Sequence, residues 1–396
     1  MRRSFELAAP FVAALSLAAC SGSGAHAEMP WAHRQQPGAS QALGFNTLPN
    51  GLSVVPACVG SRIGMAQCDV LVRTGIGPDV TGFGPADLQA AYNFPTARGL
   101  GQVVAVVDAY DNPNAASDLG TYRSNFGLGT ANFTKFNQLG QTTGFPTADT
   151  SWGTEIDLDV EMVSASCPLC TIYLVEANTN RFTDLQIAET EAVKLGATIV
   201  TNSYGGTGAK RSAYDSQQVT YVASAGDTGF GIDDPADFPR VVSVGGTTLF
   251  KGGGSRGWTE SVWFGTGAGC STDPKPRWQQ DSGCSTRTAN DVSAVADPET
   301  GVEIYDSYGA HGWFVVGGTS VSAPLLAGAF GLAGNSTLQN GGRTFWNQQH
   351  QRHLYPILNG GDGSCSPTYL CQAGTNQFGN YSGPGGWGSP NGVGAF

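Results

Sequence analysis

VGGTSVSAP, at residues 316–324, runs directly into the apolar segment LLAGAF at residues 325–330. The glycines indicate a tight turn, and the alanine-rich apolar segment is typical of a buried helix. Ser320 would then lie at the start of this helix, where the positive end of the helix dipole stabilises developing negative charge. Two interpretations are open at this point: Ser320 is a catalytic nucleophile, or it is an ordinary helix N-cap.

Short apolar runs alternate with helical patterns from about residue 82 onward. Helical spacing covers residues 114–126 and 182–195, and the apolar runs cover residues 102–107, 171–175, 198–201, 219–223 and 241–244. This alternation predicts an α/β fold, with a mostly parallel central sheet and helices on both faces. Functional groups gather at the carboxyl ends of such strands. Asp108 and Asn202-Ser203 follow directly after an apolar run, and Gly226-Asp227 follow another run after two small residues.

Gly318-Thr319-Ser320-x-x-x-Pro324 resembles the nucleophile motif that the subtilisins share with the sedolisins, which are serine-carboxyl peptidases. The two families have the same fold but give the serine different catalytic partners. The resemblance therefore implies a subtilisin-like three-layer fold, and the partners must be identified in this chain. None of its five histidines follows the His-Gly-Thr pattern of subtilisins. His311, nine residues before the serine, is the histidine base that stays open as an alternative.

A pair of carboxyl groups is the better candidate for the base. Glu155 and Asp159 are four residues apart in a segment with helical spacing, so they are neighbours on one helical face. Two like charges at that distance repel, so one of them should hold its proton more tightly. Such a pair can act as a general base in acid. Asp157 and Glu161, in the same segment, are interpreted as a solvated acidic face of the helix.

The Glu155-x-x-x-Asp159 segment, which is followed by Pro168 and an apolar strand, resembles the catalytic helix of sedolisins. That resemblance implies that Glu155 is the base for Ser320 and that Asp159 orients Glu155. Ser203-Tyr204-Gly205 is similar to the strand end that pairs with the substrate backbone in both families.

Asp227, in Gly226-Asp227-Thr228-Gly229, resembles the sedolisin aspartate that replaces the subtilisin oxyanion-hole asparagine. Only a protonated carboxyl group can donate a hydrogen bond to an oxyanion, so this role implies activity in acid. Asp108 stands where subtilisins have their catalytic aspartate. It is interpreted as a residue that contacts the catalytic residues without touching the substrate, or as a structural residue.

The resemblance also implies one calcium ion near the C-terminus, but the chain departs from the pattern there. Pro356 stands where one aspartate ligand is expected, and Ser382 or Gly388 stands at the other, which leaves Asp362 as the aspartate nearby. Calcium prefers charged oxygen ligands. The site is therefore predicted to be absent or weak, and no other cofactor or metal is expected.

The N-terminus reads as an export signal over residues 1–27, because Arg2-Arg3 precede an apolar stretch too short to span a bilayer. Leu17-Ala18-Ala19-Cys20 resembles a bacterial lipobox that would lipidate Cys20, whereas Ala25-His26-Ala27 resembles an ordinary cleavage site. Residues 28–80 read as a linker or a short pro-region, and residues 81–396 as the catalytic domain. Since sedolisins usually carry a long folded prodomain, this short segment is a second departure from the family.

Eight of the nine cysteines remain when Cys20 is set aside, an even number in an exported chain. They fall into four local couples, which predict disulfides: Cys58/Cys68, Cys167/Cys170, Cys270/Cys284 and Cys365/Cys371. Zinc is the rival interpretation for Cys167-Pro168-Leu169-Cys170, but no second Cys-x-x-Cys exists and export favours oxidation. The Cys365/Cys371 bridge would take over part of the stapling role of the calcium ion.

These features together predict an exported, monomeric, acid-active endopeptidase that acts on proteins or peptides. Its net charge of −11 and its lack of a basic run exclude nucleic acid as a partner. The protein would contact a membrane only through a lipid on Cys20. Two alternatives remain: an esterase that uses the same serine, although Gly-x-Ser-x-Gly is missing around Ser320, and a non-catalytic surface protein that retains the fold.

Overall fold

The computed structural model describes residues 46–47, 53–58, 60, 63–74, 82–338, 340–375 and 379–396. The chain divides into two units, residues 1–35 and 36–396, and every described residue belongs to the second unit. The predicted export signal, with Cys20, lies outside the described residues. Within the ranges given above, no helix is both long and apolar enough to cross a membrane.

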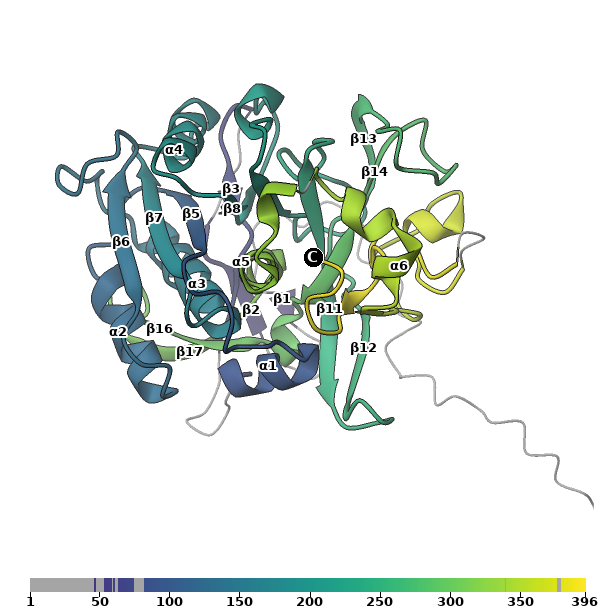
Figure 1. The fold of residues 1–396 in the computed structure, drawn as a ribbon, viewed down its shortest axis with the longest axis horizontal. Helices are drawn as coiled ribbons and strands as arrows, with labels where there is room; N and C mark the ends of the chain where they lie inside the picture. The colour runs from purple at the N-terminus through teal and green to yellow at the C-terminus, as the bar shows by residue number, and fades with distance from the viewer. Residues whose placement is uncertain are drawn as a thin grey trace, which may run out of the picture. The chain divides into compact units, whose positions relative to one another are not determined.

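A central sheet of eight strands organises the second unit (Figure 1). Its strands follow the order β12-β11-β10-β8-β5-β7-β6, and β15 also pairs with β11. All pairs are parallel except the antiparallel β11–β12 pair at one edge. The bounds are β5 Val103–Ala109, β6 Asn132–Asn137, β7 Thr171–Ala177, β8 Ile199–Asn202, β10 Thr220–Ser224, β11 Val241–Lys251, β12 Trp258–Val262 and β15 Val292–Val295. The predicted parallel sheet is confirmed.

Helices cover both faces of this sheet, as the alternating pattern predicted. Helix α4 packs against β7 and β5 on one face, while α3 and α5 pack against each other and against the sheet on the other face (Figure 1). The helices are α1 Pro85–Tyr92, α2 Ala115–Asn125, α3 Thr150–Ser166, α4 Phe182–Lys194, α5 Thr319–Ala333 and α6 Gln348–Gln351. The α3–α5 contact matters for function, because it brings Glu155 and Ser320 together from distant parts of the chain.

A second, antiparallel sheet has the order β1-β2-β4-β17-β16. Its strands are β1 Asn46–Thr47, β2 Ser53–Pro56, β4 Leu71–Thr74, β16 Val302–Asp306 and β17 Gly312–Gly317. Strand β3, Gln67–Cys68, pairs instead with β9, Tyr204–Gly205. Short pairs β13 Gly269–Pro274 with β14 Thr286–Ala289, and β18 Leu354–Tyr355 with β19 Ser389–Pro390, complete the strands.

Strands β2, β3 and β4 belong to the stretch that the sequence indicated as a linker or short pro-region. The described part of that stretch is no free linker, because β4 pairs with β17, the strand that leads into Gly318 and Ser320. Its identity as a pro-region stays a prediction. The short, proline- and glycine-punctuated segments lack the long apolar periodicity by which a strand is recognised in sequence.

The N-terminus of α3 has a side-chain cap that the sequence analysis did not identify. The Asp149 carboxylate accepts hydrogen bonds from Ser151 N and Trp152 N, each at 3.0 Å. We expect Asp149→Ala to lower the free energy of unfolding by about 1 kcal/mol, because two amides of the first turn lose their partner. Asp149→Asn retains the acceptor and serves as the control. Denaturant unfolding checks this expectation, and equal stability of the two variants would contradict it.

Candidate active site

Ser320 lies in the first turn of α5, where its hydroxyl and its backbone amide point to different partners. The Ser320 hydroxyl lies 3.0 Å from Glu155 Oε2 and 3.2 Å from the Ser203 carbonyl oxygen, and it can donate to one of them at a time. The Ser320 amide donates to the Asp69 carbonyl oxygen at 3.2 Å. Gly318 is the N-cap of the helix, so the interpretation of Ser320 as an N-cap is wrong.

Gly318 has φ of 107°, a backbone conformation that favours glycine. A Cβ atom at this position would stand 2.1 Å from the Asp69 carbonyl oxygen and 2.5 Å from Asp227 Oδ2. The glycine therefore leaves space beside Ser320 in which a carbonyl oxygen and the Asp227 carboxyl group both fit.

Glu155 and Asp159 lie one turn apart on α3 and are fully buried, as is Asp108 at the end of β5. Burial raises the pKa of Glu155 well above its ordinary value, and the neighbouring Asp159 and Asp108 raise it further, whereas the hydrogen bond from Ser320 acts against the rise. Burial likewise raises the pKa of Asp159, and it raises that of Asp108 to about 8. The three carboxyl groups therefore hold protons in acid that isolated groups would release.

Asp157 and Glu161 are fully buried, so the prediction that they form a solvated face is wrong. Helix α3 packs against α1, α2, α5, β5 and β16, which leaves it no face toward water. Asp157 Oδ2 accepts from Asn112 Nδ2 at 2.7 Å, and Glu161 Oε2 accepts from Tyr305 N at 3.0 Å. Carboxyl oxygens of Asp157, Asp118 and Asp306 lie within 4.8 Å of one another, and protein donors bind all three side chains.

Asp227 is held in one orientation by Thr319, which precedes the serine. Asp227 Oδ1 accepts from the Thr319 amide at 2.8 Å and from the Thr319 hydroxyl at 2.9 Å. The second oxygen, Oδ2, then lies in the space beside Gly318. Burial raises the pKa of Asp227 to about 7. The positioning role of Thr319 was missed in the sequence, although its place beside Ser320 is the signal that could have revealed it.

The Ser203-Tyr204-Gly205 segment follows β8 and offers backbone groups rather than side chains to the site. The Ser203 carbonyl oxygen accepts from the Asp69 amide at 3.3 Å, in addition to its contact with the Ser320 hydroxyl. The Tyr204 side chain is buried, with its ring centroid 6.2 Å from that of Trp152 and 6.4 Å from that of Phe182. The structure thus brings together Ser320, Glu155, Asp159, Asp227, Asp108 and this segment.

His311 does not join this group. It is exposed in the turn between β16 and β17, and its Nδ1 lies 3.4 Å from the Ser307 carbonyl oxygen. Since the Ser320 hydroxyl hydrogen-bonds Glu155 instead, the geometry favours a carboxyl base over a histidine base.

All four predicted disulfides are present: Cys58–Cys68, Cys167–Cys170, Cys270–Cys284 and Cys365–Cys371. The Cys167–Cys170 bridge closes the end of α3 before β7, which argues against the zinc interpretation of this couple.

The segments where the resemblance placed calcium ligands do not fit a calcium ion. Pro356 has no side-chain oxygen, and Ser382 Oγ accepts from Gly385 N at 3.2 Å. The Gly385 carbonyl oxygen accepts from Ser293 Oγ at 3.0 Å, so it too has a protein donor.

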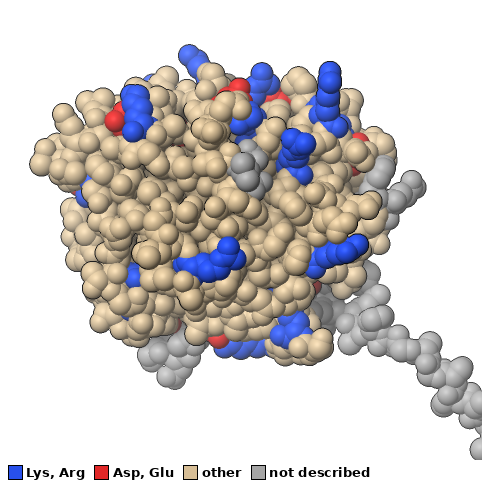
Figure 2. Space-filling model, in the orientation of Figure 1, with Lys and Arg blue, Asp and Glu red and all other residues tan. Residues whose placement is uncertain are grey.

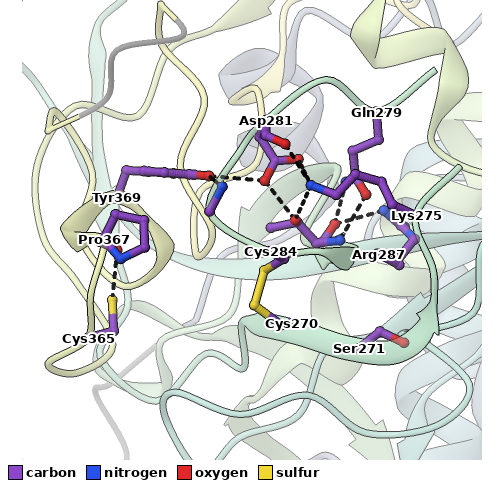
Figure 3. The surroundings of a disulfide bond; sticks show 12 residues. Cys270, Ser271, Lys275, Gln279, Asp281, Cys284, Arg287, Cys365, Pro367 and Tyr369 are labelled. Atoms are coloured by element: carbon purple, nitrogen blue, oxygen red, sulfur yellow. Dashed lines mark hydrogen bonds and ion pairs between the residues drawn. A yellow bond between two sulfur atoms is a disulfide. The ribbon is translucent and has the colours of Figure 1, made fainter. Parts of the chain in front are cut away.

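Covalent and ionic links hold this C-terminal region together (Figure 3). Tyr369, between Cys365 and Cys371, donates to Asp281 at 3.0 Å, and Lys275 Nζ lies 3.0 Å from the same carboxylate. Beside them, the buried Arg287 guanidinium donates to Asp291 Oδ1 at 3.0 Å. The 365–371 loop is thus tied to the β13–β14 hairpin, which is consistent with the stapling role predicted for its disulfide.

Many acidic side chains of the described residues are buried. Figure 2 shows Lys and Arg side chains over one face and only small areas of Asp and Glu, although the net charge is −11. The carboxyl groups of α3 described above are among those buried, and burial raises the pKa of each well above its ordinary value.

The folded state should therefore be more stable in acid than at neutral pH. Below about pH 4, both the folded and the unfolded chain hold these protons. As the pH rises, the unfolded chain ionises first, so stability falls by up to about 1.4 kcal/mol per group and pH unit until the folded groups ionise as well. The pKa of Asp227 is raised to about 7 and that of Asp108 to about 8, so these two groups extend the range of falling stability to neutral pH. Thermal unfolding of Ser320→Ala checks the prediction, and a Tm that rises toward pH 8 would contradict it.

Known proteins share this fold and part of this sequence. The model of the subtilase family matches residues 147–358. Sedolisin from Pseudomonas sp. (strain 101) is 27% identical over an alignment of 293 residues, which covers 62% of this chain and 49% of that protein. The chain thus spans about half the length of this relative. The structure of Pseudomonas sedolisin, a serine-carboxyl proteinase complexed with pseudo-iodotyrostatin, superposes with a TM-score of 0.66 at 24% identity and covers 78% of this chain and 96% of that one. A psychrophilic protease has a TM-score of 0.50 at 16% identity, with 80% and 99% covered.

Proposed function

Because the chain belongs to the subtilase family and is sedolisin-like within it, we propose that it is an acid-active serine-carboxyl endopeptidase. The observation that carries this proposal is the 3.0 Å hydrogen bond between the Ser320 hydroxyl and Glu155 Oε2. It joins a serine at the N-terminus of one buried helix to a carboxyl pair on another, which is the arrangement of a nucleophile and its base.

Ser320 attacks the carbonyl carbon of the peptide bond, and Glu155 takes the hydroxyl proton. Asp159 positions Glu155 and shares its proton, and Asp108 keeps this pair in a carboxyl-rich, water-poor environment. The same proton then goes from Glu155 to the leaving amine. Water repeats the sequence on the acyl-enzyme and releases the carboxylic acid.

Negative charge develops on the carbonyl oxygen during the attack. Two hydrogen-bond donors would stabilise it: the Ser320 amide and the protonated Asp227 carboxyl group. Thr319 holds Asp227 Oδ1, so the Oδ2 hydroxyl would be the donor to the oxyanion. The backbone of Ser203, Tyr204 and Gly205 would bind the substrate as an added antiparallel strand. Substrates are therefore proteins or peptides in extended conformation.

A fluorophosphonate or peptide-aldehyde probe tests this proposal on the acid-treated full chain. We expect labelling at Ser320 in the wild type and none in Ser320→Ala, with a peptide panel cleaved in preference to esters. A wild-type chain that folds but is neither labelled nor able to cleave peptides would instead indicate a non-catalytic protein with a peptidase fold.

We further propose that activity does not depend on calcium, because the residues in the expected place do not fit the ion. Dialysis against a chelator should leave kcat/KM within about twofold and the Tm unchanged, since a ligand that does not bind cannot contribute to stability. The disulfides at Cys270–Cys284 and Cys365–Cys371 would fulfil the stapling role instead. A loss of activity that added calcium restores would contradict this expectation.

Export of the chain also stays a proposal. Four disulfides suit an oxidising compartment outside the cytoplasm. A lipid on Cys20, or free secretion after cleavage at Ala27, are the two forms that mass spectrometry of the mature N-terminus would distinguish.

A further inference from the structure

A cavity of about 530 Å³ lies in the C-terminal part of the chain, and its lining contains none of the proposed catalytic or substrate-binding residues. Helix α6 contributes Gln348 and Gln351 to this lining, and Arg352 follows the helix. Trp346, at the end of a 3₁₀ turn, and Trp387, before β19, line the cavity as well. Figure 1 shows α6 beside the yellow C-terminal segments, apart from α3 with its catalytic carboxyl groups. The volume is typical of small-molecule sites, which measure about 300–1,000 Å³.

Two indole rings form an aromatic wall of this cavity. The ring centroids of Trp346 and Trp387 are 5.2 Å apart, and the two ring planes stand at 90° to each other. The buried Tyr381 ring packs against both, with its centroid 4.8 Å from that of Trp346 and 5.5 Å from that of Trp387. Both tryptophans are half-buried, so part of each side chain is fixed by the protein while the rest stays accessible. Aromatic rings held in this way offer rigid apolar surface to a ligand at little cost in conformational entropy.

Polar side chains line the rest of the cavity. Gln280, Gln348 and Arg352 are exposed, and within the described ranges none of these side chains forms a hydrogen bond or an ion pair with the protein. Each amide carries donors and an acceptor oxygen in one plane, and the guanidinium group carries donors only. The described lining contains no Asp or Glu. The cavity therefore offers paired donors and acceptors, together with the positive charge of Arg352, to a ligand.

A pyranose ring matches both of these surfaces. One of its faces consists of C–H groups that can pack on an indole ring, while its rim carries hydroxyl groups, each of which both donates and accepts hydrogen bonds. A side-chain amide can bind such hydroxyl groups with its donors and with its acceptor. A proline-rich peptide also packs on aromatic rings, but because proline has no N–H group it would leave the amide oxygens without a donor. The chemistry of the lining therefore favours a carbohydrate.

We propose that this cavity is a carbohydrate-binding site for a free polysaccharide or for a glycan attached to a protein. The site, here called the indole–amide site, consists of Gln280, Trp346, Gln348, Arg352 and Trp387. The indole rings pack on the C–H face of a sugar, and the amide and guanidinium groups bind its hydroxyl groups. Such a site would hold the protein on carbohydrate-bearing material. The inference goes beyond the proposed function, because sugar binding needs none of the catalytic residues.

Calorimetric titration of the full chain with oligosaccharides tests the site. The probes are chitohexaose and cellohexaose, which are fragments of polysaccharides, and a high-mannose N-glycan released from a protein. We expect saturable binding of at least one probe, and the probe that binds more tightly distinguishes the two sources of the ligand. A decaproline peptide represents the rival class of ligand. Binding of this peptide in place of all the sugars would overturn the carbohydrate assignment.

Two double variants in and around α6 test whether binding occurs in this cavity. Gln348→Ala with Arg352→Ala removes two exposed side chains of the indole–amide site, so the fold should stay intact while the Kd rises by about tenfold or more. Gln349→Ala with Arg343→Ala is the matched control, because both residues are exposed and neither lines the cavity. This control should bind sugar as the wild type does. An equal rise of the Kd in both double variants, or no rise in the first, would overturn the proposal.

The outcomes separate this inference from the proposed function. A wild-type protein that cleaves peptides in acid but binds none of the oligosaccharides overturns the inference and leaves the proposed function standing. A folded wild-type protein that binds an oligosaccharide through the indole–amide site but cleaves no peptide supports the inference and counts against the proposed function.

Discussion

Ser320→Ala and Glu155→Gln should each lower kcat for peptide cleavage by on the order of 10⁴ or more, and the double variant should lose little beyond the worse single one. The reason is that serine and glutamate act as one unit: a base without its nucleophile accelerates nothing, and a serine without its base is a weak nucleophile. Single-turnover or steady-state rates on a fluorogenic peptide in acid would give the loss of kcat in each single variant and in the double variant.

The chain offers matched controls for both substitutions. Ser322 is buried in the same helix, but its hydroxyl lies 3.0 Å from the Ala294 and Val295 carbonyl oxygens and donates to one of them, away from Glu155. Glu161 is buried on α3 and accepts from Tyr305 N. Ser322→Ala and Glu161→Gln should therefore change stability more than kcat. If the fold-losses of kcat in the two single variants multiplied in the Ser320/Glu155 double variant, the two residues would act independently. That result would contradict their assignment to one catalytic unit.

Asp227 should set the upper limit of the pH range in which the enzyme is active. Below about pH 7 its carboxyl group holds a proton and can donate to the oxyanion, and above that value it is ionised and repels the oxyanion. Activity should therefore fall as the pH rises through about 7. Asp227→Ala should lower kcat by about 10²–10³ below about pH 7, where the protonated carboxyl group is the donor that is lost.

Asp227→Asn separates the donor from its titration. The asparagine oxygen can accept from Thr319 as Oδ1 does now, and its amide can donate without a proton that titrates. The variant should retain activity in acid within about tenfold and extend it to higher pH than the wild type. The measurement is kcat/KM against pH for both proteins. An unchanged alkaline limb in Asp227→Asn would show that another group sets it.

Much of the fold and of the site could be predicted from local patterns. The apolar run before Asp108 is a strand buried on both faces, and the alanine-rich segment after Gly318 is a buried helix. Glu155 and Asp159 share one helical face because their spacing requires it. The cysteine couples pair as their separations suggested, since short loops bring their ends together readily.

What the sequence did not reveal depends on contacts between distant segments. Asp157 and Glu161 read as a solvated face because charged side chains usually face water, yet α3 is enclosed on all sides. The Asp69 carbonyl group reaches the Ser320 amide because the residues on its two sides pair with β9 and β17, far along the chain. No periodicity within residues 63–74 records those partners, so these contacts could be seen only in the structure.

The most direct test is peptide cleavage by acid-treated wild-type protein from about pH 2 to about pH 8, with Ser320→Ala as the baseline. We predict cleavage confined to acid, lost toward neutral pH as Asp227 ionises, and absent in Ser320→Ala. An optimum at neutral or alkaline pH would contradict the carboxyl-based site.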